Sequence, residues 1–265
     1  MPVDIYLDNV ADRHLGYVDP AFRQYWKMHA QKVSVTHSKT SSSSIICAHP
    51  NLEGFWHWTT LFNRGYDPAD LEEALSILET IPGSSDYFKF DLANARRQVI
   101  DNKALAVRDK FTQAYYKGDR QAMVAASEEF LGLCDDLAAV LKTRREFALC
   151  DWINDARSWG KTLPEKDYYE MNARTLISVW GDSFHLSDYA NRDWDGLVET
   201  YYKVRWRMFF DAVLAAFDAG ETFVNPKSTG YVGTSAQGSA EGVEGRALQF
   251  DRDIWDFECH WAHIR

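Results

Sequence analysis

The 265-residue sequence predicts an all-α fold, a multi-helix bundle-like domain with two irregular loop insertions. Apolar residues recur at steps of three and four, and helix-starting and helix-ending residues flank those stretches. No segment shows the sustained period-two alternation of a strand. The composition, 46% hydrophobic and 26% charged, is that of a globular protein with a substantial core. We therefore expect one α-helical domain over residues 1–265.

Two helices in the first third of the chain have matching start signals. Each begins with an aspartate that can cap the helix, followed by a proline suited to the first helical position. These pairs are Asp19-Pro20 and Asp67-Pro68, and they predict helices over 21–33 and 69–81.

The middle of the chain predicts two long helices. Residues 86–117 predict a helix of about nine turns, closed by Gly118. Residues 119–142 predict the next helix, in which apolar side chains from Met123 to Val140 form a stripe down one face. Because only a short break separates the two helices, we expect them to pack antiparallel.

Four more helices are predicted in the second half, each bounded by glycine, proline or a change of pattern. They cover residues 144–159, 165–179, 189–219, with a kink near Tyr202-Lys203, and 247–263. Two stretches interrupt the pattern. Residues 34–50 contain a serine run, and residues 225–245 are rich in glycine. We expect both to be solvated connectors, the second of them flexible or lid-like.

Aromatic residues are unusually frequent, at 14%, with ten Trp and thirteen Tyr. Flat rings stack on sugar faces, so this surplus suits a carbohydrate-binding surface, but it equally suits the core of a large helical domain. We expect the core to take most of these rings.

The net charge of −10 and the isoelectric point of about 5.3 exclude a typical nucleic-acid partner, because an acidic surface repels phosphate backbones. No apolar run approaches the roughly 18 residues that span a bilayer, and the first residues do not resemble a signal peptide. We therefore expect no membrane partner. The four cysteines lie far apart without a C-x-x-C pair, so we expect most of them to be free thiols. A single disulfide is the alternative.

The adjacent carboxylates of the chain do not predict an acid–base pair. They are Glu72-Glu73, Glu128-Glu129 and Asp135-Asp136, all on polar faces of predicted helices. Neighbouring helical residues point about 100° apart, so such pairs do not face each other across a cleft. His260 and His263 could share a helix face, but no third ligand is near, and we expect neither a metal nor a cofactor.

One loop between two predicted helices gathers side chains that suit a sugar. It holds Trp180, His185, Asp188, Tyr189 and Asn191. Trp and Tyr supply stacking surfaces, while His, Asp and Asn supply the hydrogen bonds that hydroxyl groups require. An alternative stays open, in which Asp188 or Asn191 caps the next helix and the rings fill the core.

The same segment resembles the C-terminal domain of α-N-acetylglucosaminidases, the glycoside hydrolases of family 89. The matching residues are Asn172, Trp180-Gly181, Asp188-Tyr189-Ala190-Asn191, Gly196-Leu197, Tyr201-Tyr202 and Arg205-Trp206-Arg207. Weaker agreement extends the resemblance to roughly residues 3–33 and 52–223 and to the closing helix from Phe250. The stretches 34–50 and 225–245 depart from the family pattern.

The resemblance implies a retaining glycosidase whose two catalytic glutamates lie on a barrel that precedes this helical domain. It therefore implies no catalytic residue here, and its partners are that missing catalytic barrel and a glycan with terminal N-acetylglucosamine. Trp180 and Tyr189 are the implied sugar contacts, followed by His185 and Asp188. Arg205 and Trp206 are expected to serve packing. The relatives are lysosomal or secreted, and nothing in these residues indicates a compartment.

Two other hypotheses stay open. The chain could be a stand-alone helical module that binds carbohydrate or a protein partner without hydrolase activity. It could also be a complete enzyme whose carboxylates the sequence does not reveal. A large apolar surface patch would favour a domain that docks on a barrel, whereas a fully polar surface would favour the stand-alone module.

Overall fold

The computed structural model describes residues 1–34, 44–52, 65–180, 188, 190–223 and 245–264. Its fold is all-α, as predicted, and the described residues contain no β-strand beyond one isolated bridge between Ala148 and Asp195. Contacts gather into two compact units, Met1–Ser42 with Asn63–Lys103, and Ser43–Phe62 with Ala104–Arg265. The single domain expected over the whole chain stays a prediction.

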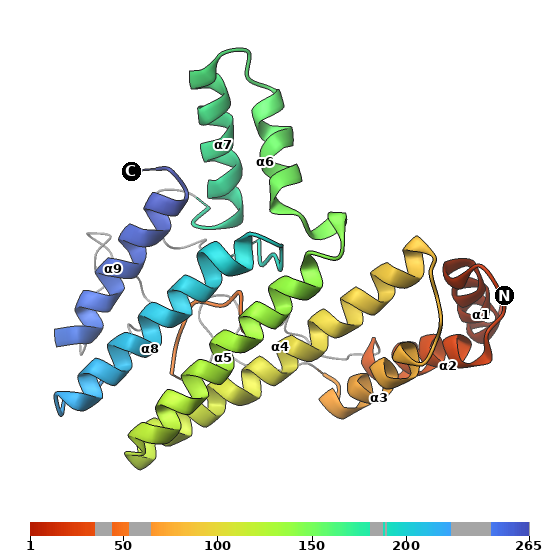
Figure 1. Cartoon of the computed structure of the whole chain (residues 1–265), viewed down its shortest axis with the longest axis horizontal. Coiled ribbons are helices and arrows are strands. Elements are labelled where there is room, and N and C mark those ends of the chain that lie inside the picture. The colour runs from red at the N-terminus through yellow and green to blue at the C-terminus, as the bar shows by residue number, and fades with distance from the viewer. Residues whose placement is uncertain (35–43, 53–64, 181–187, 189, 224–244, 265) are drawn as a thin grey trace. The chain divides into compact units, whose positions relative to one another are not determined.

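The first unit is built from short helices at the N-terminus and the first half of a long one (Figure 1). Its elements are α1 (Val3–Leu15), α2 (Pro20–Met28), the π turn η1 (His29–Val33), α3 (Pro68–Glu79) and part of α4 (Asp86–Lys117). The aspartates expected to cap two of these helices do so. Asp19 accepts hydrogen bonds from the amides of Ala21 and Phe22, and Asp67 accepts one from Ala69.

The sequence pattern missed α1, although its signal is present. Leu7, Ala11 and Leu15 recur at steps of four and are the buried residues of this helix. Gly16 then ends it with a left-handed backbone, φ 90°, and its amide bonds to the carbonyl of Asp12. The helix lacks a capping side chain at its start, so the sequence has no start signal that would predict it.

His29 makes the stability of the first unit depend on pH. Burial lowers the pKa of its imidazole below the ordinary value, because the charged form loses hydration. The unfolded chain therefore binds the proton more tightly, so this contribution is present above about pH 6.5 and is lost as pH falls. We expect His29→Gln to reduce the drop in melting temperature between pH 7.5 and 5.5, measured by circular dichroism. An unchanged drop would contradict this assignment.

The second unit contains the remaining helices. They are the rest of α4, α5 (Arg120–Leu141), the 3₁₀ turn η2 (Arg145–Phe147), α6 (Leu149–Ser158), α7 (Leu163–Ile177), the π turn η4 (Val198–Tyr202), α8 (Lys203–Asp218) and α9 (Gly245–Trp261). Figure 1 shows α5 running back beside α4, with α8 next to α5 and α9 next to α8. The antiparallel pair is held in part by Lys110 and Glu129, whose charged groups lie 3.2 Å apart.

Aromatic rings form the centre of the second unit. Phe130 of α5 lies 4.5 Å from the ring of Trp206 on α8, and Phe111 of α4 lies 4.6 Å from Phe210. All four side chains are buried, as is Phe209. The expectation that the core takes most of the aromatic residues is met only in part: these rings supply large apolar areas between the helices, whereas Trp159, Tyr168 and Tyr169 are among the exposed side chains.

Two predicted helices are shorter than expected. The helix predicted over 144–159 is broken at Ala148, whose backbone is extended, so a 3₁₀ turn precedes α6. The helix predicted from residue 189 begins only at η4, because the backbone of Asp195 pairs with that of Phe147 and Leu149. The irregularity expected near Tyr202-Lys203 lies where the π turn passes into α8.

The loop predicted over 34–50 is only partly a surface segment. Residues 35–43 lie outside the described part, but Ile45, Ile46, Cys47 and Ala48 are all buried. This corrects the expectation of a solvated connector, since four consecutive apolar residues have a hydrophobic reason to leave water. The glycine-rich stretch 225–245 falls almost wholly outside the described residues.

None of the four cysteines forms a disulfide. Cys47, Cys134 and Cys259 are buried, whereas Cys150 is exposed on α6. No helix within the described ranges is both long and apolar enough to cross a bilayer.

Candidate functional site

The segment that follows α7 has an unusual backbone. Trp180, Asp188 and Asn191 all adopt positive φ angles, of 62°, 61° and 47°. A left-handed conformation costs an ordinary L-residue about 1–2 kcal/mol, and it is a genuine outlier for a bulky side chain such as Trp. We call these three residues the junction. Strain of this kind persists only where surrounding contacts fix it.

Backbone hydrogen bonds tie the junction to the end of α7. The amide of Trp180 donates to the carbonyl of Thr175 at 2.7 Å, which closes the helix. The amide of Asp188 donates to the carbonyl of Ser178 at 2.8 Å, and that of Asn191 donates to the carbonyl of Asp188 at 3.1 Å. Asp188 is therefore held against the C-terminus of α7, although ten residues separate it from that helix's last residue, Ile177.

The side chain of Asp188 turns inward to a buried arginine. Nη1 of Arg205, on α8, lies 2.8 and 2.9 Å from the two carboxylate oxygens of Asp188. The same nitrogen donates to Oε1 of Glu258, on α9, at 2.7 Å. The side chains of Arg205 and Glu258 are both 0% exposed. Three elements distant in sequence thus meet at one guanidinium group.

Further contacts of Arg205 come from the apolar segment 45–48 and from the π turn η4. Nη2 donates to the carbonyls of Cys47 and Ala48, at 3.0 and 3.2 Å. The guanidinium carbon lies 4.5 Å from the ring centre of Tyr201 and 5.1 Å from that of Tyr202, within cation–π range. Burial raises the pKa of both phenols well above the ordinary value, so both rings stay neutral.

Trp206 is anchored in the same way as its neighbour. Its indole Nε1 donates to the carbonyl of Ile46 at 3.0 Å, and the side chain is fully buried. The expectation that Arg205 and Trp206 serve packing agrees with their burial. Segment 45–48 supplies carbonyls to both side chains, which was not predicted. The run Ile-Ile-Cys-Ala was the available signal, because an apolar run beside polar loop residues indicates burial.

The four predicted sugar contacts divide into two groups. Trp180 and Asp188 are described, whereas His185 and Tyr189 lie outside the described residues. Trp180 is half-buried. The Asp188 carboxylate is 9% exposed and is engaged by Arg205, which the sequence did not predict.

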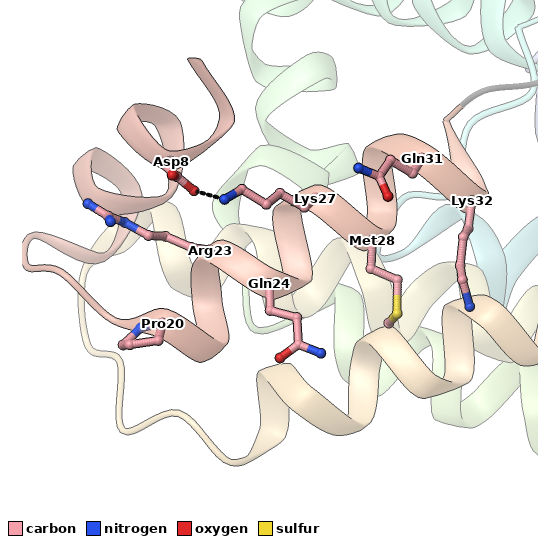
Figure 2. Close-up of a pocket in the computed structure, with 8 residues that line it drawn as sticks. All are labelled: Asp8, Pro20, Arg23, Gln24, Lys27, Met28, Gln31 and Lys32. Carbon is pink, nitrogen blue, oxygen red and sulfur yellow. Dashed lines mark ion pairs between the residues drawn. The ribbon is translucent and has the colours of Figure 1, made fainter. Parts of the chain in front are cut away.

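A hollow lies in the first unit, and Figure 2 shows the side chains around it. It is an open groove of about 450 Å³ along α2, lined by cationic and amide side chains. Lys27 bonds Asp8 at 2.8 Å, and Arg23 bonds both carboxylate oxygens of Asp12. Because each of these cations is neutralised by a carboxylate, the groove offers no net positive charge to an anionic ligand.

The acidic pairs behave as ordinary helix residues, whereas His263 lies beyond the end of α9 with a left-handed backbone, φ 63°, so it does not share a helix face with His260 as expected. Glu72-Glu73, Glu128-Glu129 and Asp135-Asp136 are all exposed, as expected for solvated helix faces. Within the described ranges no three His, Cys, Asp or Glu side chains come together in a way that could hold a metal ion.

Comparison with known proteins places this fold. Residues 6–261 match the family described as the α-N-acetylglucosaminidase C-terminal domain. The human α-N-acetylglucosaminidase is 30% identical over 228 residues, which are 82% of this chain and 30% of the human protein. A family 89 glycoside hydrolase from Clostridium perfringens, solved with PUGNAc, superposes with a TM-score of 0.77 and 24% identity, covering 96% of this chain and 28% of that one.

A further structure of the Clostridium perfringens enzyme, solved with its substrate GlcNAc-α-1,4-galactose, gives a TM-score of 0.78 at 24% identity, over 97% of this chain and 31% of that one. The fold is thus that of a helical domain found in family 89 glycoside hydrolases. The chain belongs to the α-N-acetylglucosaminidase C-terminal domain family, and it spans less than a third of the length of these relatives.

Proposed function

We propose that this chain is the part of a family 89 α-N-acetylglucosaminidase-like hydrolase that lines the substrate cleft for a terminal α-linked N-acetylglucosamine. Trp180 would stack on the sugar ring, and Tyr189, His185 and Asp188 would hydrogen-bond its polar groups. The acid and the nucleophile would come from the catalytic barrel, a partner outside this chain. The proposal rests on membership of the family and on the substrate named for the Clostridium perfringens relative.

The single observation that supports this location is the concentration of strained backbone at the junction. Trp180, Asp188 and Asn191 account for three of the four positive-φ non-glycine residues among the described ones. Such strain gathers at ligand sites, where it holds side chains in an orientation that relaxed backbone would not give. Here it occurs at Trp180 and Asp188, and the Trp180 side chain is half-buried.

The chemistry of Asp188 fits a supporting contact rather than a catalytic one. A carboxylate has about four acceptor positions, and Arg205 occupies one on each oxygen. As an acid or nucleophile Asp188 would be ill suited, because the adjacent guanidinium stabilises its charged form and competes for its oxygens.

The test of this division of labour is an assay of the isolated chain. We expect no turnover of an aryl α-N-acetylglucosaminide and weak binding of N-acetylglucosamine, detected by ligand-observed NMR. Trp180→Ala should abolish that binding, whereas Trp159→Ala, an exposed tryptophan away from the junction, should leave it unchanged. Turnover that one Asp or Glu substitution removes would instead identify a complete enzyme.

The α6–α7 hairpin supports docking on a catalytic partner over the stand-alone module. Its exposed large apolar side chains are Trp152, Trp159, Leu163, Tyr168, Tyr169 and Leu176. Spacings of seven place Trp152 with Trp159, and Tyr169 with Leu176, on shared faces. Exposed apolar groups in such number on one hairpin are typical of interaction surfaces.

We expect Trp159→Ser combined with Leu163→Gln to weaken association with a separately expressed catalytic portion by at least about tenfold. The substitutions remove exposed apolar area, so the free energy of unfolding of the chain itself should change by less than about 0.5 kcal/mol each. Tyr116→Ser, which removes an exposed ring from α4, is the matched control. Association is measured by calorimetry. Equal dissociation constants for the unmodified chain, the double variant and Tyr116→Ser would favour the stand-alone module.

A further inference from the structure

We propose that Arg205 is a positioning residue that fixes the junction from inside the second unit, through Asp188. This assignment deepens the proposed function, since it explains what holds the sugar-facing segment in place. It adds a residue that touches no ligand itself, because the Arg205 side chain is 0% exposed.

The first step is the geometry of the guanidinium group. One of its nitrogens, Nη1, reaches both oxygens of Asp188 and one oxygen of Glu258, while Nη2 reaches two backbone carbonyls of segment 45–48. Arginine offers five N–H donors in a rigid fork, so α8, α9 and segment 45–48 together determine where Asp188 sits. A lysine ammonium lacks this fork and reaches fewer of these acceptors.

The second step is the path from Asp188 to Trp180. The amide of Asp188 bonds the carbonyl of Ser178, two residues before Trp180. Ser178 is itself buried and bonds the carbonyl of Arg174 through its hydroxyl, at 2.7 Å. Releasing the carboxylate of Asp188 therefore loosens a residue that is hydrogen-bonded directly to the end of α7, next to Trp180.

An exposed arginine–carboxylate pair of the same chain serves as a control. It distinguishes a positioning role of Arg205 from the general effect of losing an ion pair. Arg120 binds the carboxylate of Asp218 through two nitrogens, at 2.6 and 2.9 Å, but both side chains are about half exposed. Arg120→Lys thus changes a forked arginine–carboxylate pair in the same unit without a junction on its far side.

Hydrogen exchange followed by mass spectrometry tests the proposal on the full chain. Arg205→Lys should speed exchange in peptides covering 176–191 by on the order of tenfold, with peptides of α5 changed less than about twofold. Arg120→Lys should change neither region. Unchanged exchange at 176–191, or equal acceleration in α5, would overturn the proposal and leave Arg205 a general packing residue.

Asp188→Asn keeps the proposal testable even where Arg205→Lys does not fold. It leaves Arg205 paired with Glu258 and alters only the junction side, and the same local acceleration is expected. Binding of N-acetylglucosamine is measured on the same samples and should weaken by at least about fivefold in both variants. If the unmodified chain binds no sugar, the proposed function fails, yet the exchange pattern still decides whether Arg205 positions the junction.

Discussion

Trp206→Ala is expected to lower the free energy of unfolding by about 3–5 kcal/mol, the range for deleting a buried aromatic side chain. The indole is fully buried and lies 4.5 Å from Phe130, 5.5 Å from Phe210 and 5.7 Å from Phe209. Rings on three sides cannot collapse into the space without leaving their own rotamers, so a cavity persists. Domains of this kind have only about 5–15 kcal/mol of stability, so the loss is a large fraction of it.

Trp206→Phe separates the ring from its hydrogen bond. This variant retains most of the aromatic volume but removes the N–H that reaches the buried carbonyl of Ile46. We expect it to cost about 1–3 kcal/mol, clearly less than alanine. Both variants are compared by guanidinium unfolding followed by far-ultraviolet circular dichroism, with the exposed Trp159→Ala as control. Equal midpoints for Trp206→Ala and the control would contradict the packing described above.

The long helices were predictable because their signals are local. Asp19, Asp67 and Gly118 each act within three or four residues of their own position, and the structure places them at helix ends as expected. The stripe on α5 also lies within one element. Patterns of this kind need no knowledge of what packs on them.

The predicted helix start at residue 189 was wrong for a non-local reason. The backbone amide and carbonyl of Asp195 form hydrogen bonds with Phe147 and Leu149, almost fifty residues earlier in the chain. These bonds replace those of a helical turn. The burial of segment 45–48 is likewise set from a distance, by Arg205 and Trp206. Neither partner can be read from the residues around the segment itself.

The candidate site was predictable in composition but not in role. The residue types single out Trp180 and its polar neighbours, whose contact with a sugar stays a prediction, and they do not predict that Arg205 engages Asp188. Its engagement by Arg205 depends on the turn of the backbone to positive φ at Asp188. Asp tolerates that conformation better than most residues, and a pattern of residue types does not reveal which Asp adopts it.

The second large effect is expected from Glu258→Ala. This substitution removes a carboxylate that is 0% exposed and accepts from Arg205 at 2.7 Å, while His49 Nδ1 lies 3.9 Å from the same oxygen. Breaking a buried ion pair from one side leaves the other charge desolvated and only partly compensated, which costs about 3–5 kcal/mol. Thermal and guanidinium unfolding measure the loss, and Glu129→Ala, which breaks an exposed pair with Lys110, is the control. That control should cost less than about 1 kcal/mol.

Replacing the whole buried cluster separates its contribution to stability from its contribution to the junction. Apolar residues in place of a buried charged triad are often neutral or stabilising, because no charge is left desolvated. We therefore expect Asp188→Leu, Arg205→Met and Glu258→Leu together to recover most of the stability that Glu258→Ala loses. The triple variant should still exchange amide hydrogens rapidly at 176–191, since nothing then holds residue 188 in a left-handed backbone that leucine disfavours. A triple variant that is both stable and fully protected there would mean that packing alone orients the junction.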